Sequence, residues 1–235
     1  MFKKLIAFTM AELILVMTII GVVAALILPN LSNNVDEKAT IASVRKIYNQ
    51  LQTAHAGVIS QYGQIAYMYP ITQTTTQTTQ DYAQKLLKNL QVRKECGFDA
   101  GCFDINNVSY AGAGNSYYTA TLKDGSSIAI MLESGESIKD SIEINYDSDS
   151  SYPCSFGKIY IDIDGLNKGY DREDYDIFSF VIDENEIKPE GLSIYTPGKV
   201  NVNVAYTTAW VIKAGNMDYL RCLDELDWDS KKTCK

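Results

Sequence analysis

The stretch IDIDGLNKGYDREDYDIF concentrates oxygen-bearing side chains within one short segment. Calcium binds roughly six to eight carboxylate, amide or carbonyl oxygens, and crowded carboxylates repel one another unless a cation lies among them. The spacing differs from that of an EF-hand loop. Two interpretations therefore stay open: a calcium site, or an acidic turn that water solvates. The candidate ligands are Asp162, Asp164, Asn167, Asp171, Asp174 and Asp176.

The five cysteines form no CxxC pair, and His55 is the only histidine, so a structural zinc site is not indicated. Cys96 and Cys102 lie close together in CGFDAGC, and Cys222 and Cys234 bracket the C-terminal segment. If this part of the chain is exported, two local disulfides and an odd Cys154 are the simplest expectation. The alternative is five reduced thiols.

No catalytic motif is present in the sequence. The chain has no GxSxG, no P-loop and no HExxH. His55 has no second histidine and no nearby nucleophile, and we interpret it as a packing or surface residue. We therefore do not expect an enzyme.

One glutamate, Glu12, stands at the start of a long apolar run. Residues 8–28 are close to the roughly 20 residues that a helix needs to cross the hydrocarbon of a membrane. A carboxylate in such a run is costly and usually marks function. Lys3 and Lys4 precede the run, so the N-terminus is expected to stay in the cytoplasm. The LPNLSNN that follows offers no signal-peptidase site.

The stretch KKLIAFTMAELILVMTIIGVVAALILPNL resembles the N-terminus of type IV pilins and type II secretion pseudopilins. Those proteins carry a short basic leader, a small residue, Phe, Thr and a glutamate. The resemblance implies cleavage by prepilin peptidase between Ala7 and Phe8, N-methylation of Phe8, and Glu12 as the assembly carboxylate. Pro29 lies where many members have a helix-bending proline. Ala7 departs from the glycine that is usual before the cut.

The resemblance further implies a structural subunit of a type IV pilus-like filament or a type II secretion pseudopilus. Its partners would be copies of itself or other pilin-like subunits, the prepilin peptidase and the inner-membrane assembly machinery. The protein would be a single-pass cytoplasmic membrane protein whose globular domain lies outside the cytoplasm. Some pseudopilins hold a calcium ion in a loop near the C-terminal strands, which adds support to the calcium interpretation, although charge runs are more often solvated turns. The alternative is a membrane-anchored extracytoplasmic binding domain that does not polymerise.

Apolar residues from Ile41 to Tyr62 recur at spacings of three and four, which predicts an amphipathic helix that ends at Gly63. We expect one helix from about Thr9 to Tyr62, bent or loosened near Pro29. The polar tract TQTTTQTTQ is expected to be an exposed loop, and DYAQKLLKNLQV a short helix.

The later sequence favours strands. YYTATLKDGSSIAIML predicts a hairpin that turns at Asp124 and Gly125, and FGKIYIDID, YDIFSFVID and EIKP continue the β pattern. AYTTAWVIKAG is expected to be a helix that stops at Gly215. The fold class is therefore α+β, with a long N-terminal helix whose first half spans the membrane, packed on a mostly antiparallel, pilin-like sheet.

We expect a leader at 1–7, a transmembrane or filament-core helix at 8–30, an amphipathic continuation at 31–63, and an exported globular domain at 64–235. The chain has a net charge of −8. Such an acidic protein is a poor candidate for binding a phosphate backbone, so no nucleic-acid partner is expected.

Overall fold

The computed structural model describes residues 10–69, 75–108, 116–133, 156–170, 172–191, 207–228 and 230–234. The chain divides into two compact units, Met1–Ala39 and Thr40–Lys235. The first is helical from Met10 onward, and the second contains a β-sheet, the rest of the long helix and several short helices.

Helix α1 runs from Met10 to Tyr62, close to the bounds that the sequence predicts, and remains helical through Pro29. It ends where Gly63 adopts a φ of 96°, a conformation that glycine reaches without steric cost. The apolar stripe of its second half is buried, as its spacing predicts. The buried side chains are those of Ile41, Val44, Ile47, Leu51, Ala54 and Val58.

Six strands form one sheet in the order β1-β2-β3-β4-β5-β6, and each pairs antiparallel with the next. The α+β class is thereby confirmed. The predicted hairpin is β2 and β3, with Gly125 at a φ of 100° in its turn. The strands are β1 (Val92–Gly97), β2 (Tyr118–Leu122), β3 (Ser127–Leu132), β4 (Gly157–Asp162), β5 (Ile177–Ile182) and β6 (Ile187–Pro189).

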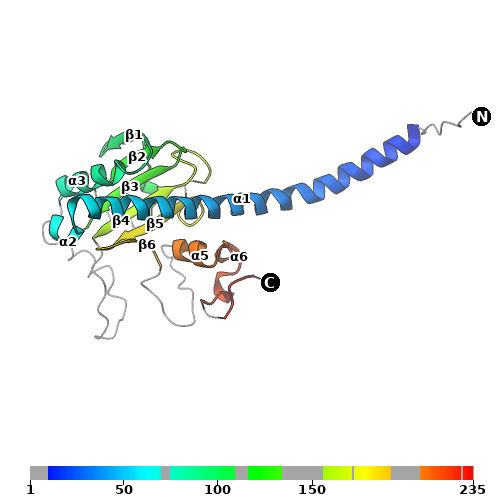
Figure 1. Cartoon of the computed structure of the whole chain (residues 1–235). Helices are drawn as coiled ribbons and strands as arrows, with labels where there is room; N and C mark the ends of the chain where they lie inside the picture. Colours follow the sequence, from blue (N-terminus) through cyan, green and yellow to red (C-terminus); the bar gives the residue numbers. More distant parts are fainter. Residues whose placement is uncertain are drawn as a thin grey trace, which may run out of the picture. The chain divides into compact units, whose positions relative to one another are not determined.

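Each face of the sheet has its own apolar core. On one face, Ile159, Ile161 and Phe180 pack with the buried stripe of α1 and with α3 (Thr76–Leu87). Figure 1 shows these two helices lying over this face. On the opposite face, Tyr160 and Ile177 belong to a smaller cluster. Because alternate residues of a strand point to opposite faces, β4 contributes to both cores.

Helix α3 begins earlier than its sequence suggests. The threonine tract was expected to be a loop throughout, yet α3 starts at Thr76. Thr75 caps the helix, because its hydroxyl accepts from the N–H of Thr78 while the Thr78 hydroxyl accepts from the N–H of Thr75. This reciprocal cap overrides the low helix propensity of threonine. Residues 72–74 lie outside the described residues.

The remaining helices are short, and two of them, α5 and α6, follow the sheet in sequence. α5 covers Thr207–Lys213 and stops before Gly215, which has a φ of 74°, as predicted. α6 covers Tyr219–Cys222. Single turns occur at α2 (Ile65–Met68), η2 (Ile105–Asn107) and η4 (Leu223–Glu225).

Candidate functional site

The N-terminal segment is described from Met10. Glu12 lies in the first turn of α1, where a carboxylate interacts favourably with the helix dipole. Ala7 and Phe8 lie outside the described residues, so cleavage and methylation stay predictions. Among the residues that the structure describes, no helix combines the length and hydropathy that crossing a membrane requires.

On both sides of Glu12, the first part of α1 exposes many large apolar side chains. The exposed fractions of its large side chains range from 47% at Leu13 to 81% at Met10. Soluble monomers rarely expose so much apolar area in one place. The side chains concerned are those of Met10, Leu13, Ile14, Leu15, Val16, Met17, Ile19, Ile20, Val22 and Val23.

The acidic loop between β4 and β5 brings three of its predicted ligands to one end of the sheet. Asp162 is buried at the end of β4 and accepts from the N–H of Gly165 at 2.9 Å. Burial and, to a smaller extent, a hydrogen bond with Asp164 raise the pKa of Asp162 to about 7. Asp176 accepts from the N–H groups of Tyr170 and Arg172 at 2.7 and 2.6 Å. These carboxylates therefore hold the loop in its conformation by accepting hydrogen bonds from its backbone N–H groups.

Asp164 and Asp176 approach each other around Gly169. A Cβ built on Gly169 would collide with Asp164 Oδ2 and would lie 3.0 Å from Asp176 Oδ2. Gly169 has a φ of 65°. Only glycine therefore fits between these two carboxylates.

Asp174 turns away from this group and holds the C-terminal helices. It accepts from the Thr207 hydroxyl with one carboxylate oxygen, and its backbone carbonyl accepts from Tyr219 Oη at 2.6 Å. Burial raises its pKa to about 7, although the Thr207 hydrogen bond acts in the opposite direction. Asp174 also has a φ of 69°, which is uncommon outside glycine. Its role is to fix α5 and α6 onto the loop.

Of the other two predicted ligands, only Asn167 is among the described residues. Asn167 is exposed, with a φ of 62°, and Asp171 lies outside the described residues. Within the described ranges, no group of three or more His, Cys, Asp or Glu side chains is arranged to hold a metal ion. Calcium binding by the loop stays a prediction.

A second charged cluster lies on the sheet face opposite α1, and nothing in the sequence pattern singles it out. Lys158 Nζ lies 3.0 Å from Glu190 Oε1, and both side chains are largely buried. Burial lowers the pKa of Lys158, but the attraction of Glu190 and Glu133 outweighs it, so the pKa is raised. Burial raises the pKa of Glu133. Tyr160 Oη, on the same face, has no hydrogen-bond partner among the described residues.

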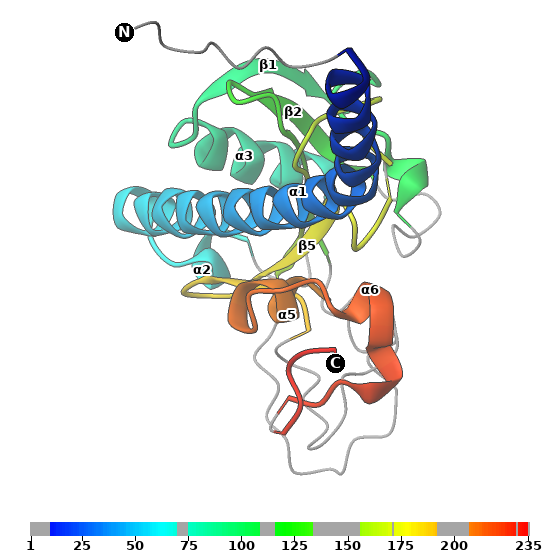
Figure 2. The same ribbon diagram turned by 90° about the vertical axis from the view of Figure 1, so that its right-hand side faces the viewer.

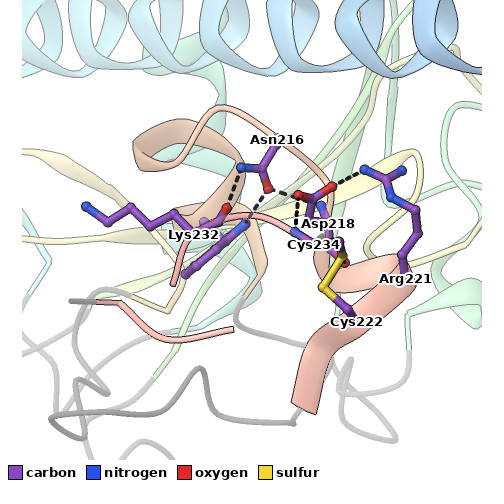
Figure 3. Close-up of polar contacts among 7 residues, drawn as sticks. Asn216, Asp218, Arg221, Cys222, Lys232 and Cys234 are labelled. Carbon is purple, nitrogen blue, oxygen red and sulfur yellow. Dashed lines mark hydrogen bonds and ion pairs between the residues drawn. A yellow bond between two sulfur atoms is a disulfide. The ribbon is translucent and has the colours of Figure 1, made fainter. Parts of the chain in front are cut away.

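The C-terminal segment is tied together by Asn216 and Asp218 (Figure 3). Asn216 Oδ1 accepts from Trp210 Nε1 at 2.9 Å and from the N–H of Asp218 at 3.1 Å. Asn216 Nδ2 donates to the carbonyl of Lys232 at 2.8 Å. Asp218 Oδ2 accepts from the N–H of Cys234 at 2.8 Å. The two side chains thus hold the end of the chain against the buried Trp210.

Four cysteines form two local disulfides, as expected. One joins Cys96 to Cys102, which are 6 residues apart in sequence, and the other joins Cys222 to Cys234, which are 12 residues apart. Cys154 lies outside the described residues. The second disulfide covalently closes the segment that Asp218 organises.

His55 is fully buried in the second half of α1, which fits its interpretation as a packing residue. Its Nδ1 lies 3.0 Å from Tyr82 Oη of α3.

Comparison of the chain with protein-family models, with curated proteins and with solved structures found no match.

Proposed function

We propose that the chain is a structural subunit of a pilin-like filament, a type IV pilus or a type II secretion pseudopilus. The observation that carries the proposal is the apolar surface of α1 that follows Glu12 directly. A helix that is apolar on all sides is stable only inside lipid or among other apolar helices. A filament core of packed N-terminal helices provides the second environment, and the cytoplasmic membrane provides the first before assembly.

Glu12 is then the group that sets the position of one subunit on the next. Cleavage after Ala7 would leave a positively charged amine on Phe8, a few residues from Glu12 in sequence. An amine from a neighbouring subunit at about 4 Å, with an effective dielectric constant of about 20, gains roughly 4 kcal/mol before desolvation. A buried carboxylate without such a partner would instead be destabilising. The pair therefore favours one register of neighbouring helices over others.

The unit Thr40–Lys235 fits the outside of such a filament. Its two disulfides suit an oxidising compartment outside the cytoplasm. The acidic composition keeps the exported surface soluble. We therefore place the N-terminus in the cytoplasm, the apolar segment in the membrane or filament core, and the sheet-bearing unit outside.

The test is the N-terminus of the protein extracted from its native membrane. Intact mass and the N-terminal peptide should show a chain that begins at N-methylated Phe8. Glu12→Gln should abolish filaments seen by electron microscopy while leaving the protein in the membrane, because the amide keeps the shape and loses the charge. Glu37→Gln, a matched change in the same helix, should leave filaments intact.

A chain that begins at Met1, or filaments that form normally with Glu12→Gln, would overturn this proposal. The first result would instead favour an anchored extracytoplasmic domain that does not polymerise.

A further inference from the structure

A groove beside α1 lies next to the turn between β2 and β3. It has a volume of about 250 Å³. Leu90 and Leu122 give it an apolar part, and Lys46 and Lys123 supply two cationic side chains. The lining residues are Lys46, Gln50, Leu90, Gln91, Leu122, Lys123 and Asp124.

The groove carries a net positive charge on an acidic chain. Lys46 Nζ is paired with Asp124 Oδ2 at 2.7 Å, which neutralises one of the two cations. Lys123 is exposed and forms no ion pair with another described residue. The groove therefore suits a ligand that combines an apolar group with a carboxylate.

Exposed side chains of that chemistry follow one another in the C-terminal segment of the same chain. Leu220 of α6 is 38% exposed, and Asp224 of η4 is exposed four residues later. Asp224 makes no ion pair within the described part of the chain, whereas its neighbour Glu225 is paired with Lys231. We call Leu220 and Asp224 the C-terminal ridge.

The groove and the C-terminal ridge lie on opposite sides of α1 within the unit Thr40–Lys235. Lys46 reaches the β2–β3 turn, whereas the adjacent Arg45 donates to the carbonyl of Ile212 in α5 at 3.0 Å. Figure 2 shows β1, β2 and α3 on one side of α1, with α5 and α6 on the other. The ridge of one subunit therefore cannot fill the groove of the same subunit.

We propose that the groove binds the C-terminal ridge of a second copy of this chain, with Leu220 against Leu90 and Leu122 and Asp224 paired with Lys123. The two surfaces differ, so the contact is heterologous, and a heterologous contact that does not close into a ring repeats into a helical filament. This inference rests on the proposed function and names the contact that the exported units make in it.

The first test uses the assembled wild-type chain and a zero-length carbodiimide. The reagent joins a lysine amine to a carboxylate as an amide and takes up the released water as its urea. Protein with ¹⁴N and protein with ¹⁵N are assembled together, so a peptide of mixed isotopes reports a link between subunits. We expect a mixed peptide that joins Lys123 to Asp224.

The second test exchanges the charges. Lys123→Glu or Asp224→Lys alone should lower the yield of filaments about tenfold, because like charges then face each other. The double variant, Lys123→Glu with Asp224→Lys, should restore the yield. Lys88→Glu and Asp99→Lys, which make the same changes at exposed sites elsewhere, should have little effect.

The outcomes separate this inference from the proposed function. Normal filaments with no Lys123–Asp224 link and no effect of either single exchange would overturn the inference alone. Loss in both single variants without recovery in the double would show that the groove has another occupant, and would also overturn it. A wild-type chain that retains Met1 and forms no filaments would overturn both.

Discussion

The contribution of the single histidine to the stability of the protein should fall as the pH is lowered from 7 to 5. His55 has no exposed surface, and its Nδ1 is hydrogen-bonded to Tyr82. Its Nε2 has no hydrogen-bond partner among the described residues. Burial lowers the pKa of His55 to about 4, although the nearby Asp183 acts in the opposite direction. The folded protein therefore keeps this ring neutral at pH values where the unfolded chain protonates it.

Proton linkage gives the sign and the size of this change in the free energy of unfolding. The pKa of His55 in the folded protein lies below its usual value of 6.5, so the stability is fully present above that value and is lost as the pH falls towards 4. With these two pKa values, the contribution of His55 to the free energy of unfolding decreases by about 2 kcal/mol between pH 7 and pH 5. Asp162 and Asp174 act oppositely, because their pKa values are raised to about 7 in the fold.

A matched variant isolates the histidine from these carboxyls. His55→Gln keeps a hydrogen-bonding group for Tyr82 and cannot titrate, while Asp162 and Asp174 are common to both proteins. Urea unfolding of the full chain in mild detergent, at pH 7 and pH 5, gives the change in unfolding free energy for each protein. Between pH 7 and pH 5, the unfolding free energy of the wild type should fall by about 2 kcal/mol relative to that of His55→Gln. Thr53→Gln, at an exposed site on the same helix, should behave like the wild type.

Nuclear magnetic resonance gives a direct second readout. Because the chain has one histidine, selective ¹³C labelling yields one imidazole signal. Its shift should stay constant from pH 8 to about pH 5. A midpoint near 6.5, or equal pH dependence in the wild type and His55→Gln, would refute the reasoning.

Three further predictions concern the disulfide, the buried ion pair and the acidic loop. Replacing Cys222 and Cys234 by serine should lower the unfolding free energy by about 3 kcal/mol, measured with urea, because the unfolded chain gains the freedom of the opened loop. An unchanged urea midpoint would contradict this. Lys158→Met should lower the free energy of unfolding by about 3 kcal/mol, because it leaves Glu190 buried without its cation. Adding Glu190→Gln should recover most of this loss. A double variant that is no more stable than Lys158→Met alone would refute the pairing. If the loop at 162–176 binds calcium, chelator-treated protein should melt at a higher temperature in millimolar calcium, and an unchanged melting temperature would exclude the site.

Local sequence signals predicted the elements that depend on local chemistry. Gly125 marks the hairpin turn, Gly63 and Gly215 mark helix ends, and each adopts a positive φ. The alternation in FGKIYIDID and YDIFSFVID marks β4 and β5. Strand β1 was not predicted, because VRKECG has no alternation and pairs with β2 through an irregular register. Its strand state is set by its neighbour and by the Cys96–Cys102 disulfide.

The sequence shows six oxygen-bearing side chains in one loop, but not which of them lie together in the fold. The sequence of the loop does not show which of its six candidate ligands point toward one another. Asp174 is drawn away by Thr207 and Tyr219, which lie 33 and 45 residues later in the chain. Contacts at such separations depend on where α5 and α6 pack. The sequence therefore indicates that carboxylates are concentrated in this loop. It does not indicate that Asp162 and Asp176 bind the backbone of the loop while Asp174 binds residues of the C-terminal helices.

The Lys158–Glu190 pair escaped prediction for a related reason. Alternation in β4 places Lys158 and Tyr160 on the face opposite Ile159, and such a polar face is ordinarily exposed to water in an antiparallel sheet. Here Phe103 and Val108, from the segment after β1, help to cover that face as a second core. A charge pattern along one strand cannot reveal this cover, because the covering residues belong to a segment without periodicity. Once covered, Lys158 requires a carboxylate nearby, and Glu190, next to the edge strand β6, supplies it.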